Sequence, residues 1–303
     1  MGLTRDAVRV RVPATSANLG PGFDTLGLAL GLHDELAAQV RVDGLEVEVE
    51  GQGAGDVPRD GRHLVVRAMQ ATFERLGERP AGLWLRCRNV VPHARGLGSS
   101  SAAIVGGVVL ARALVDDGAA RLDDAAALDL AATLEGHPDN VAPALLGGLT
   151  VAGHGADGFW ATRAPLDDRV AAVAFVPPTG VSTEAARGLL PVQVPHADAA
   201  ANAARAALLV VALGGATEHL LRATDDLLHQ GYREPAMPES LALVRGLRAD
   251  GVAAVVSGAG PTVLALTDGT DGTATGLLDR CPDGWTAVRL DVDHDGAVVL
   301  SGP

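Results

Sequence analysis

Hydrophobic and polar positions recur along the chain with two different periods, and these periods predict both strands and helices. Val8–Val12 and Leu45–Val49 alternate apolar with charged residues, which is typical of half-buried strands. Leu64–Leu76 has apolar residues at helical spacing and is followed by Gly77, which predicts a helix that stops there. The same reasoning predicts further strands over Leu83–Val91, Gly147–Gly155, Val170–Val176, Ala253–Val256, Thr262–Leu266 and Val298–Leu300, and further helices over Asp123–Glu135, Ala199–Leu213, Thr217–His229 and Ser240–Ala249.

The order of these elements favours the α+β class. Strands and helices do not alternate one for one in the first half of the chain, as a doubly wound parallel sheet would require. A length of 303 residues is enough for two ordinary domains. The most loop-like stretch, Gly155–Asp168, holds the expected boundary. We therefore predict an N-terminal domain over 1–160 and a C-terminal domain over 161–303.

Composition and charge exclude several classes of protein. The formal net charge of −13 argues against a nucleic-acid partner. The 24 residues counted as Lys or Arg are all Arg, which excludes a lysine-dependent P-loop and every lysine nucleophile. Cys87 and Cys281 are too few for a disulfide framework or a metal cluster. The apolar run Ala102–Val115 is too short to span a bilayer, and residues 1–12 lack the apolar core of a signal peptide, so we expect a cytoplasmic protein without membrane contact.

One segment combines a predicted strand, a Gly/Ser-rich turn and a predicted helix, the order that builds an anion site. Glycines let the backbone approach a phosphate, and the first amides of the helix point toward it. The alternative is an ordinary turn whose serine caps a helix. The segment is neither a Walker A loop, because the Lys is missing, nor Gly-x-Gly-x-x-Gly, because Ser101 stands at the last glycine position. This Gly/Ser loop comprises Pro92, His93, Ala94, Arg95, Gly96, Leu97, Gly98, Ser99, Ser100, Ser101 and Ala102.

Two further glycine-rich turns and an acidic turn strengthen the phosphate interpretation. Pro13–Asp24 follows the first predicted strand, and Ser257–Thr262 lies between two strands. Glu135–Asn140 joins a helix end to a polar turn with carboxylates at both sides. Their combination in one apolar chain indicates a nucleotide site.

These segments resemble the motifs of the GHMP kinases, and the strings at Pro13–Asp24 and Glu135–Pro143 are similar to those of homoserine kinases in particular. Ser182–Arg187 and Gly231–Pro235 also match. The resemblance spans essentially the whole chain. It implies an N-terminal domain like ribosomal protein S5 domain 2, a ferredoxin-like C-terminal domain, and a site between them. It further implies ATP-dependent phosphorylation of the side-chain hydroxyl of L-homoserine, a step of threonine biosynthesis, by a homodimer.

By position in the motifs, the resemblance assigns the Gly/Ser loop to the ATP phosphates and Ser100 and Glu135 to Mg²⁺, a metal that prefers oxygen ligands. A solvated carboxylate at a helix end is the alternative for Glu135. Arg187 and Arg233 suit a substrate carboxylate because a guanidinium binds it bidentately. The expected substrate-binding residues are Asn18, Asp24, His137, Asn140, Thr183, Arg187 and Arg233.

The residues expected to act in catalysis are Asn140, Asp24 and Arg187. Asp24 and Asn18 suit the substrate ammonium, and Asn140 suits the hydroxyl, although Asp24 as proton acceptor is an alternative. Asn140 cannot take a proton, so we predict catalysis by alignment and charge neutralisation, which a loose phosphoryl-transfer transition state permits. Two other functions stay open: a GHMP kinase of another alcohol, and a nucleotide-binding regulator without turnover.

Overall fold

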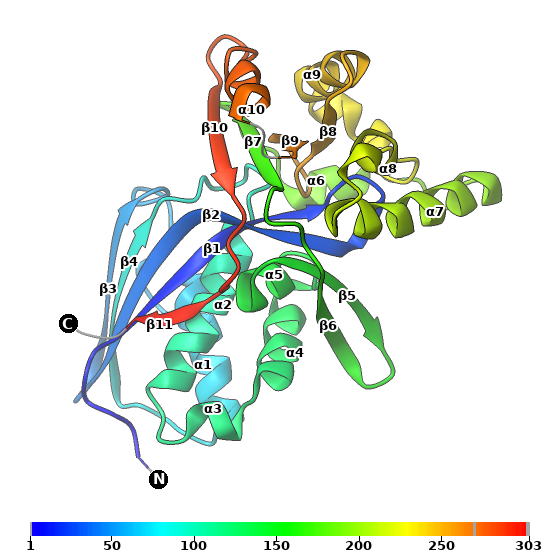
Figure 1. Cartoon of the computed structure of the whole chain (residues 1–303). Helices are drawn as coiled ribbons and strands as arrows, with labels where there is room; N and C mark the ends of the chain where they lie inside the picture. The colour runs from blue at the N-terminus through cyan, green and yellow to red at the C-terminus, as the bar shows by residue number, and fades with distance from the viewer. Residues whose placement is uncertain (1, 269–270, 301–303) are drawn as a thin grey trace.

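Two β-sheets organise the chain, and the computed structural model describes them over residues 2–268 and 271–300 (Figure 1). Within these residues the first sheet has 7 strands in the order β11-β1-β2-β4-β3, with β5 paired to β2 and β6 to β5. The strands β3 and β4 are parallel, whereas the other pairs are antiparallel. The bounds are β1 (Val8–Asn18), β2 (Gly22–Arg41), β3 (Gly44–Gly51), β4 (Gly82–Asn89), β5 (Leu149–Gly155), β6 (Gly158–Ala164) and β11 (Val298–Leu300).

Helices cover one face of this sheet. They are α1 (Leu64–Arg75), α2 (Ser99–Ala113), α3 (Gly118–Arg121), α4 (Asp124–Glu135) and α5 (Val141–Leu146). The helix α2 lies at the centre, against β1 and between α1 and α4 (Figure 1). A Cβ on Gly107 would lie 2.6 Å from the Val65 carbonyl oxygen, so only glycine lets α2 approach α1 this closely. The sequence of α2 thereby lets it pack closely against α1.

The second sheet has 4 strands in the order β10-β7-β9-β8 among the described residues. Taken along the chain as strand, helices, two strands, helix and strand, this order is the ferredoxin-like arrangement. The strands are β7 (Ala171–Val176), β8 (Ala253–Val256), β9 (Val263–Thr267) and β10 (Thr286–Asp291). The helices are α6 (Thr183–Gly188), α7 (His196–Leu213), α8 (Leu220–Ala223), α9 (Pro238–Ala249) and α10 (Asp271–Leu278), with 3₁₀ turns η1 (Thr217–His219) and η2 (Gly231–Ala236). The ferredoxin-like expectation is confirmed.

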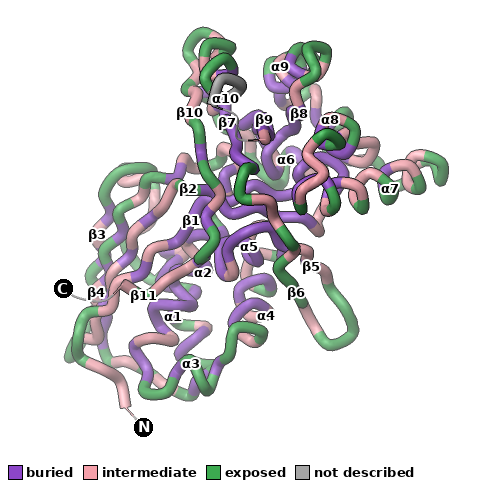
Figure 2. The backbone as a smooth tube through the Cα atoms, viewed as in Figure 1, coloured by how far each residue is buried: buried purple, intermediate pink, exposed green. Residues whose placement is uncertain are grey.

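A shared core joins the two sheets. Leu28 and Leu30 of β2 are fully buried and belong to one apolar cluster with Leu264 of β9 and Leu213 of α7. Figure 2 shows buried segments of both sheets around this junction. The last described strand, β11, returns to pair with β1. The division at 160/161 stays a prediction, and it falls within β6.

Most predicted strands and helices are confirmed, and two predictions are wrong. The stretch Gly155–Asp168 is no loop, because β6 forms a hairpin with β5. None of the residues of this strand is buried, so it carries no hydrophobic alternation that a pattern could reveal. The helix expected over Thr217–His229 ends at Ala223 in α8. Beyond it the Asp226 carboxylate accepts backbone N–H groups of His229 and Gln230, which replaces the helical pattern by a turn.

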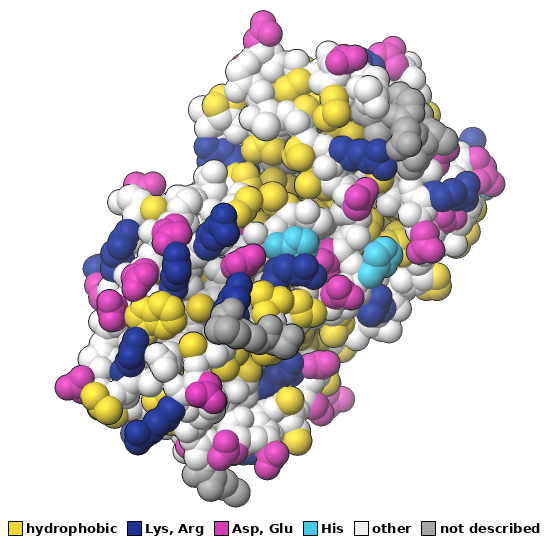
Figure 3. Space-filling view, turned by 60° about the vertical axis from the view of Figure 1, so that its left-hand side comes forward, with side chains coloured by type: hydrophobic (Ala, Val, Ile, Leu, Met, Phe, Trp, Pro, Cys, Tyr) yellow, Lys and Arg dark blue, Asp and Glu magenta, His cyan; other side chains and the backbone are white. Residues whose placement is uncertain are grey.

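On the face drawn in Figure 3, arginine and acidic side chains are interspersed rather than gathered by sign. None of the helices within residues 2–268 and 271–300 combines the length and the apolar composition that a bilayer span requires.

Candidate active site

The Gly/Ser loop ends in a left-handed turn that leads directly into α2. Gly98 has φ 70°, and a Cβ there would lie 1.9 Å from the Thr15 hydroxyl oxygen, so no other residue fits. Ser99 and Ser100 then begin α2, whose first amides are available to an anion. Ser257, from the third glycine-rich turn, donates a hydrogen bond of 2.6 Å to the Gly96 carbonyl. The glycine-rich turn Ser257–Thr262 therefore holds the Gly/Ser loop in place in front of α2.

A cavity of about 250 Å³ opens in front of this helix N-terminus. Glycine-rich segments supply one end of it, and α6 and η2 supply the other. Expected site residues that line it are Asn18, Ala94, Gly96, Gly98, Ser99, Ser100, Glu135, His137, Asn140, Thr183, Arg187 and Arg233. Six loop residues do not line it, namely Pro92, His93, Arg95, Leu97, Ser101 and Ala102, and the expected site residue Asp24 does not line it either.

Arg95 does not extend toward the cavity. Its guanidinium donates to the His93 carbonyl at 2.8 Å and to the carbonyls of Pro177 and Pro178. Leu97 is 1% exposed and belongs to the core between the sheets. These two residues therefore fix the loop in place rather than contact a ligand.

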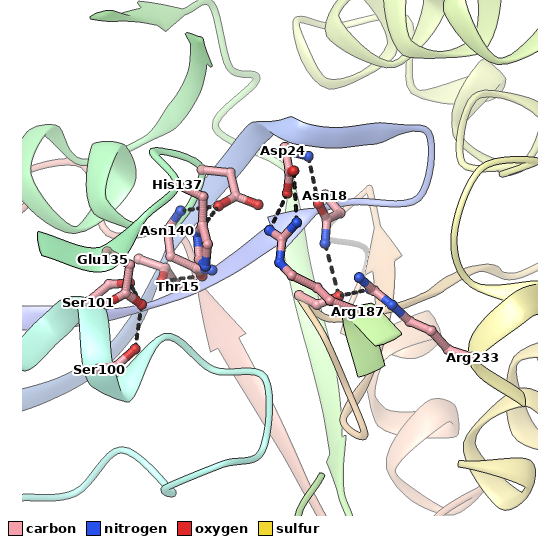
Figure 4. A network of polar contacts seen from close by, with 12 residues as sticks. Thr15, Asn18, Asp24, Ser100, Ser101, Glu135, His137, Asn140, Arg187 and Arg233 are labelled. Carbon is pink, nitrogen blue, oxygen red and sulfur yellow. Dashed lines mark hydrogen bonds and ion pairs between the residues drawn. The ribbon is translucent and has the colours of Figure 1, made fainter. Parts of the chain in front are cut away.

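At one end of the cavity, two serine hydroxyls converge on one carboxylate. Ser100 and Ser101 both donate to Oε1 of Glu135, the second at 2.9 Å (Figure 4). The serines stand in the first turn of α2, and Glu135 is the last residue of α4. The expected proximity of Ser100 and Glu135 is present, and the donor set consists of oxygen atoms alone. These hard oxygen donors fit Mg²⁺.

Asn140 lies in the middle of the site. The Thr15 hydroxyl donates to its Oδ1 at 2.8 Å, which leaves the Nδ2 amide as the group available to the cavity. Asp139 accepts from the Asn140 backbone N–H at 3.1 Å and contacts His137 Nδ1 at 2.8 Å. Burial alone lowers the pKa of His137, but the hydrogen bond and charge of Asp139 outweigh it, so the pKa is raised.

At the other end, Arg187 forms a bidentate ion pair with Asp24. The two N–O distances are 3.0 and 2.6 Å, and the guanidinium also lies 5.5 Å from the centre of the Phe23 ring (Figure 4). The hydrogen bond to Asp24 raises the pKa of Arg187 above its ordinary value. Both charges are about one third exposed, so a ligand can reach them. The sequence placed these residues in one site but did not predict that they pair with each other.

Asn18 spans two of the motifs. Its Oδ1 accepts from the Asp24 backbone N–H at 2.9 Å, and its Nδ2 donates to the Gly258 carbonyl at 2.9 Å. Both ends of the amide are thus committed to backbone. The residue holds Asp24, which has a left-handed φ of 52°, in position beside the cavity.

Arg233 is 1% exposed yet lines the cavity. Its Nη1 donates to the Gly258 carbonyl at 3.1 Å and lies 3.0 Å from His229 Nδ1. Among the described residues, its Nε has no hydrogen-bond partner. Burial and, second, the charge of Arg187 lower the pKa of Arg233. A buried guanidinium with an unused donor calls for an anionic ligand.

A second cavity, of about 240 Å³, lies on the other side of the α2 N-terminus and shares Ser99 and Ser100 with the first. His93 lines it, and so does His63, the residue just before α1. His63 is 5% exposed, and its Nδ1 has no partner within the described part of the chain. Burial and, second, the neighbouring His93 lower the pKa of His63. The rest of the wall is mostly apolar, with three polar or charged residues in it: Leu36, Val57, Pro58, Leu64, Val65 and Ala103, and Asp34, Arg62 and Asn89.

The sequence analysis assigned no role to three residues of the site, Thr15, Asp139 and Ser182. All three stand inside the quoted motifs, so only their contacts were unknown. Ser182 caps α6 through a 3.1 Å bond from the Ala185 N–H and thereby sets the start of the helix that carries Thr183 and Arg187.

Comparison with known proteins agrees with this geometry. The chain matches the GHMP kinases N terminal domain over residues 63–148 and the GHMP kinases C terminal family over residues 196–274. A homoserine kinase of Streptomyces coelicolor is 57% identical over 97% of this chain and 94% of its own length. The chain belongs to the homoserine kinase family of GHMP kinases. A homoserine kinase of Clavibacter michiganensis is 51% identical over 96% of this chain and 93% of its own length.

Solved structures of the family share the whole architecture. A homoserine kinase from Cytophaga hutchinsonii superposes with a TM-score of 0.83 at 25% identity and covers 99% of both chains. A mevalonate diphosphate decarboxylase from Staphylococcus aureus superposes with a TM-score of 0.70 at 14% identity over 97% of this chain and 98% of its own, which shows the common fold alone. The expected GHMP kinase fold is confirmed.

Proposed function

We propose that this protein transfers the γ-phosphoryl group of ATP to the side-chain hydroxyl of L-homoserine, giving ADP and O-phospho-L-homoserine for threonine biosynthesis. The observation that carries the proposal is one cavity with two different ends. A helix N-terminus with serines and a carboxylate forms one end, and Arg187, which is paired with Asp24, and Arg233 form the other. The first suits a nucleotide phosphate, and the second suits an amino acid.

The polyphosphate of ATP fits the Gly/Ser loop. Main-chain amides at the start of α2 and the helix dipole stabilise negative charge without any lysine. Because the second cavity adjoins the same serines and is largely apolar, it suits the nucleoside. The unpartnered Nδ1 of His63 then offers a hydrogen bond to the base.

Ser100 and Glu135 are the residues that would hold Mg²⁺. The Ser101 hydroxyl, which also donates a hydrogen bond to the Glu135 carboxylate, offers a further oxygen atom there. When bound there, the metal would neutralise charge on the transferring phosphoryl group. The hydrogen bonds from both serines keep the Glu135 carboxylate at the phosphate end of the cavity.

Homoserine carries an ammonium and a carboxylate, and the Asp24–Arg187 pair offers both counter-charges. We assign the ammonium to Asp24 and the carboxylate to Arg187 and Arg233, so that the substrate exchanges with an existing ion pair. A substrate with both charges gives Asp24 and Arg187 each a new partner when their own ion pair opens. An analogue with one charge leaves a partly buried residue unpaired, which is costly.

The chemistry assigned to the protein is alignment. The Nδ2 amide of Asn140 lies between the two ends and is a donor, which suits a hydroxyl or phosphate oxygen but not proton removal. Asp24 is paired with a cation, Arg187, in the structure, so we assign Asp24 to the cationic ammonium rather than to the reacting hydroxyl. His137 and Thr183 complete the wall.

Release of ADP with L-homoserine, mevalonate and galactose side by side tests the proposal, with the product identified by ³¹P NMR. Turnover confined to homoserine is the expected result. Preference for another alcohol would support a different GHMP kinase, and nucleotide binding without turnover would support a regulator. The division at 160/161, the homodimer and the cytoplasmic location are further proposals, of which sedimentation of the purified chain tests the second.

A further inference from the structure

Behind Arg233 lies a fully buried histidine, His229, that does not itself line the cavity. His229 is 0% exposed and stands in the turn that Asp226 closes, with its ring 5.2 Å from that of Phe23. One ring nitrogen, Nε2, lies 2.7 Å from the Gly20 carbonyl oxygen. The other, Nδ1, lies 3.0 Å from Arg233 Nη1. The ring therefore connects the Asn18–Gly22 turn to the buried arginine.

These two partners select one protonation state of the ring. A carbonyl oxygen only accepts, so Nε2 carries the hydrogen. A guanidinium only donates, so Nδ1 carries the lone pair. Only the neutral imidazole with hydrogen on Nε2 satisfies both contacts. Nearby charges come from several elements: Asp226 beside the ring, Arg233 of η2, and Asp24 of β2.

The same contact determines which donors of Arg233 remain free. Both hydrogens of Nη1 are used, one by His229 Nδ1 and one by the Gly258 carbonyl. Among the described residues, Nε has no partner, and no hydrogen bond is made by Nη2. The guanidinium is thus hydrogen-bonded through one nitrogen and lies 5.6 Å from the centre of the Phe23 ring, while its remaining donors have no partner in the described part of the chain.

We infer that His229 is a positioning residue for substrate recognition, whose neutral Nε2–H form holds Arg233 so that its free donors bind the carboxylate of the substrate. The inference rests on the proposed function, since it takes the ligand of Arg233 to be the carboxylate of an amino acid. His229 touches neither the phosphates nor the reacting hydroxyl in this account. Its removal affects recognition of the carboxylate and leaves the other steps in place.

Two amide substitutions separate the two contacts. Asn places its amide near the Nδ1 position, so His229→Asn retains an acceptor for Arg233. Gln places its amide near the Nε2 position, so His229→Gln retains the Gly20 contact and loses the acceptor. In His229→Gln, we expect KM for homoserine to rise about tenfold, the effect of one hydrogen bond to a charged group, with kcat and KM for ATP changed less than about twofold. The KM of His229→Asn for homoserine should lie between the values of His229→Gln and the wild type. His219→Gln, at an exposed histidine, is the control.

Three comparisons decide against a merely structural role. The rise in KM should be absent with 3-amino-1-propanol, which lacks the carboxylate, and Arg233→Gln should show no further loss when His229→Gln is added. Equal losses with homoserine, ATP and the amino alcohol, or additive losses in the double variant, would overturn the inference.

Imidazole ¹⁵N spectra of the unaltered protein test the tautomer without any substitution or turnover. A neutral Nε2–H ring that persists to pH 5 is expected, and titration of all histidines above pH 6 would also overturn it. Wild-type turnover of homoserine tests the proposed function separately.

Discussion

The two ends of the cavity are built in different ways. At the phosphate end, backbone amides, Ser100 and Ser101 come from one continuous loop and helix, and both hydroxyls donate to the Glu135 carboxylate. At the other end, Asp24 and Arg187 are 163 residues apart and form a charged pair only through the fold. Backbone positions tolerate changes of side chain, whereas a charged pair depends on each member. The phosphate end is therefore expected to control the rate, and the charged end to control the choice of substrate.

Removing the carboxylate at the phosphate end should have the largest effect. Glu135→Gln keeps the shape of the site but removes the charge that suits a metal, so we expect kcat to fall about 100-fold or more with little change in KM for homoserine. Steady-state ADP release measures both constants. Glu74→Gln, at an exposed carboxylate of α1, is the matched control. Turnover near the wild-type value would refute the role of Glu135.

At the charged end, Arg187→Ala should weaken homoserine binding by roughly 2 kcal/mol, or about 30-fold in KM, because a partner of a partly buried charge is lost. KM for ATP should stay within about twofold, because we assign the nucleotide to the other end of the cavity. The amino alcohol 3-amino-1-propanol should not be weakened, since it lacks the carboxylate. If homoserine and the amino alcohol lose affinity equally, Arg187 acts on the phosphoryl group or on the fold.

His63→Phe tests whether the second cavity belongs to the phosphate end. The substitution keeps a ring but removes the unpartnered nitrogen, so KM for ATP should rise about fivefold, the effect of one neutral hydrogen bond. KM for homoserine should not change. If titration calorimetry shows that the variant binds ATP with unaltered affinity, the base does not bind at His63.

The smallest expected effect concerns stability rather than activity. Because the folded pKa of His137 is raised, its protonated form binds Asp139 most strongly below the unfolded pKa of about 6.5, and this stabilisation is lost as pH rises through the folded pKa. His137→Gln should therefore lower Tm by about 2 °C more at pH 5.5 than at pH 8.5. Thermal unfolding followed by circular dichroism measures this difference. An equal change of Tm at both pH values would contradict the assignment.

The sequence predicted the α+β class, most elements and the residues of the phosphate end, because each depends on a local pattern. Ser100 and Glu135 each stand in a sequence motif, and the motif indicates the local structure around them. The pairing of Asp24 with Arg187 was not predictable, since it depends on how α6 lies beside the β1–β2 turn. His229 was missed for a local reason: Asp226 ends the expected helix by accepting backbone N–H groups, and helical spacing gives no signal of such a turn.

Specificity constants of the unaltered protein test the central claim most directly. ADP release with saturating ATP is measured for L-homoserine, for 3-amino-1-propanol, which lacks the carboxylate, and for 4-hydroxybutyrate, which lacks the ammonium. If one charged end recognises both groups of the amino acid, kcat/KM for homoserine should exceed that for each analogue by about 100-fold or more. Comparable constants for homoserine and either analogue would contradict the division of labour between the two ends of the cavity.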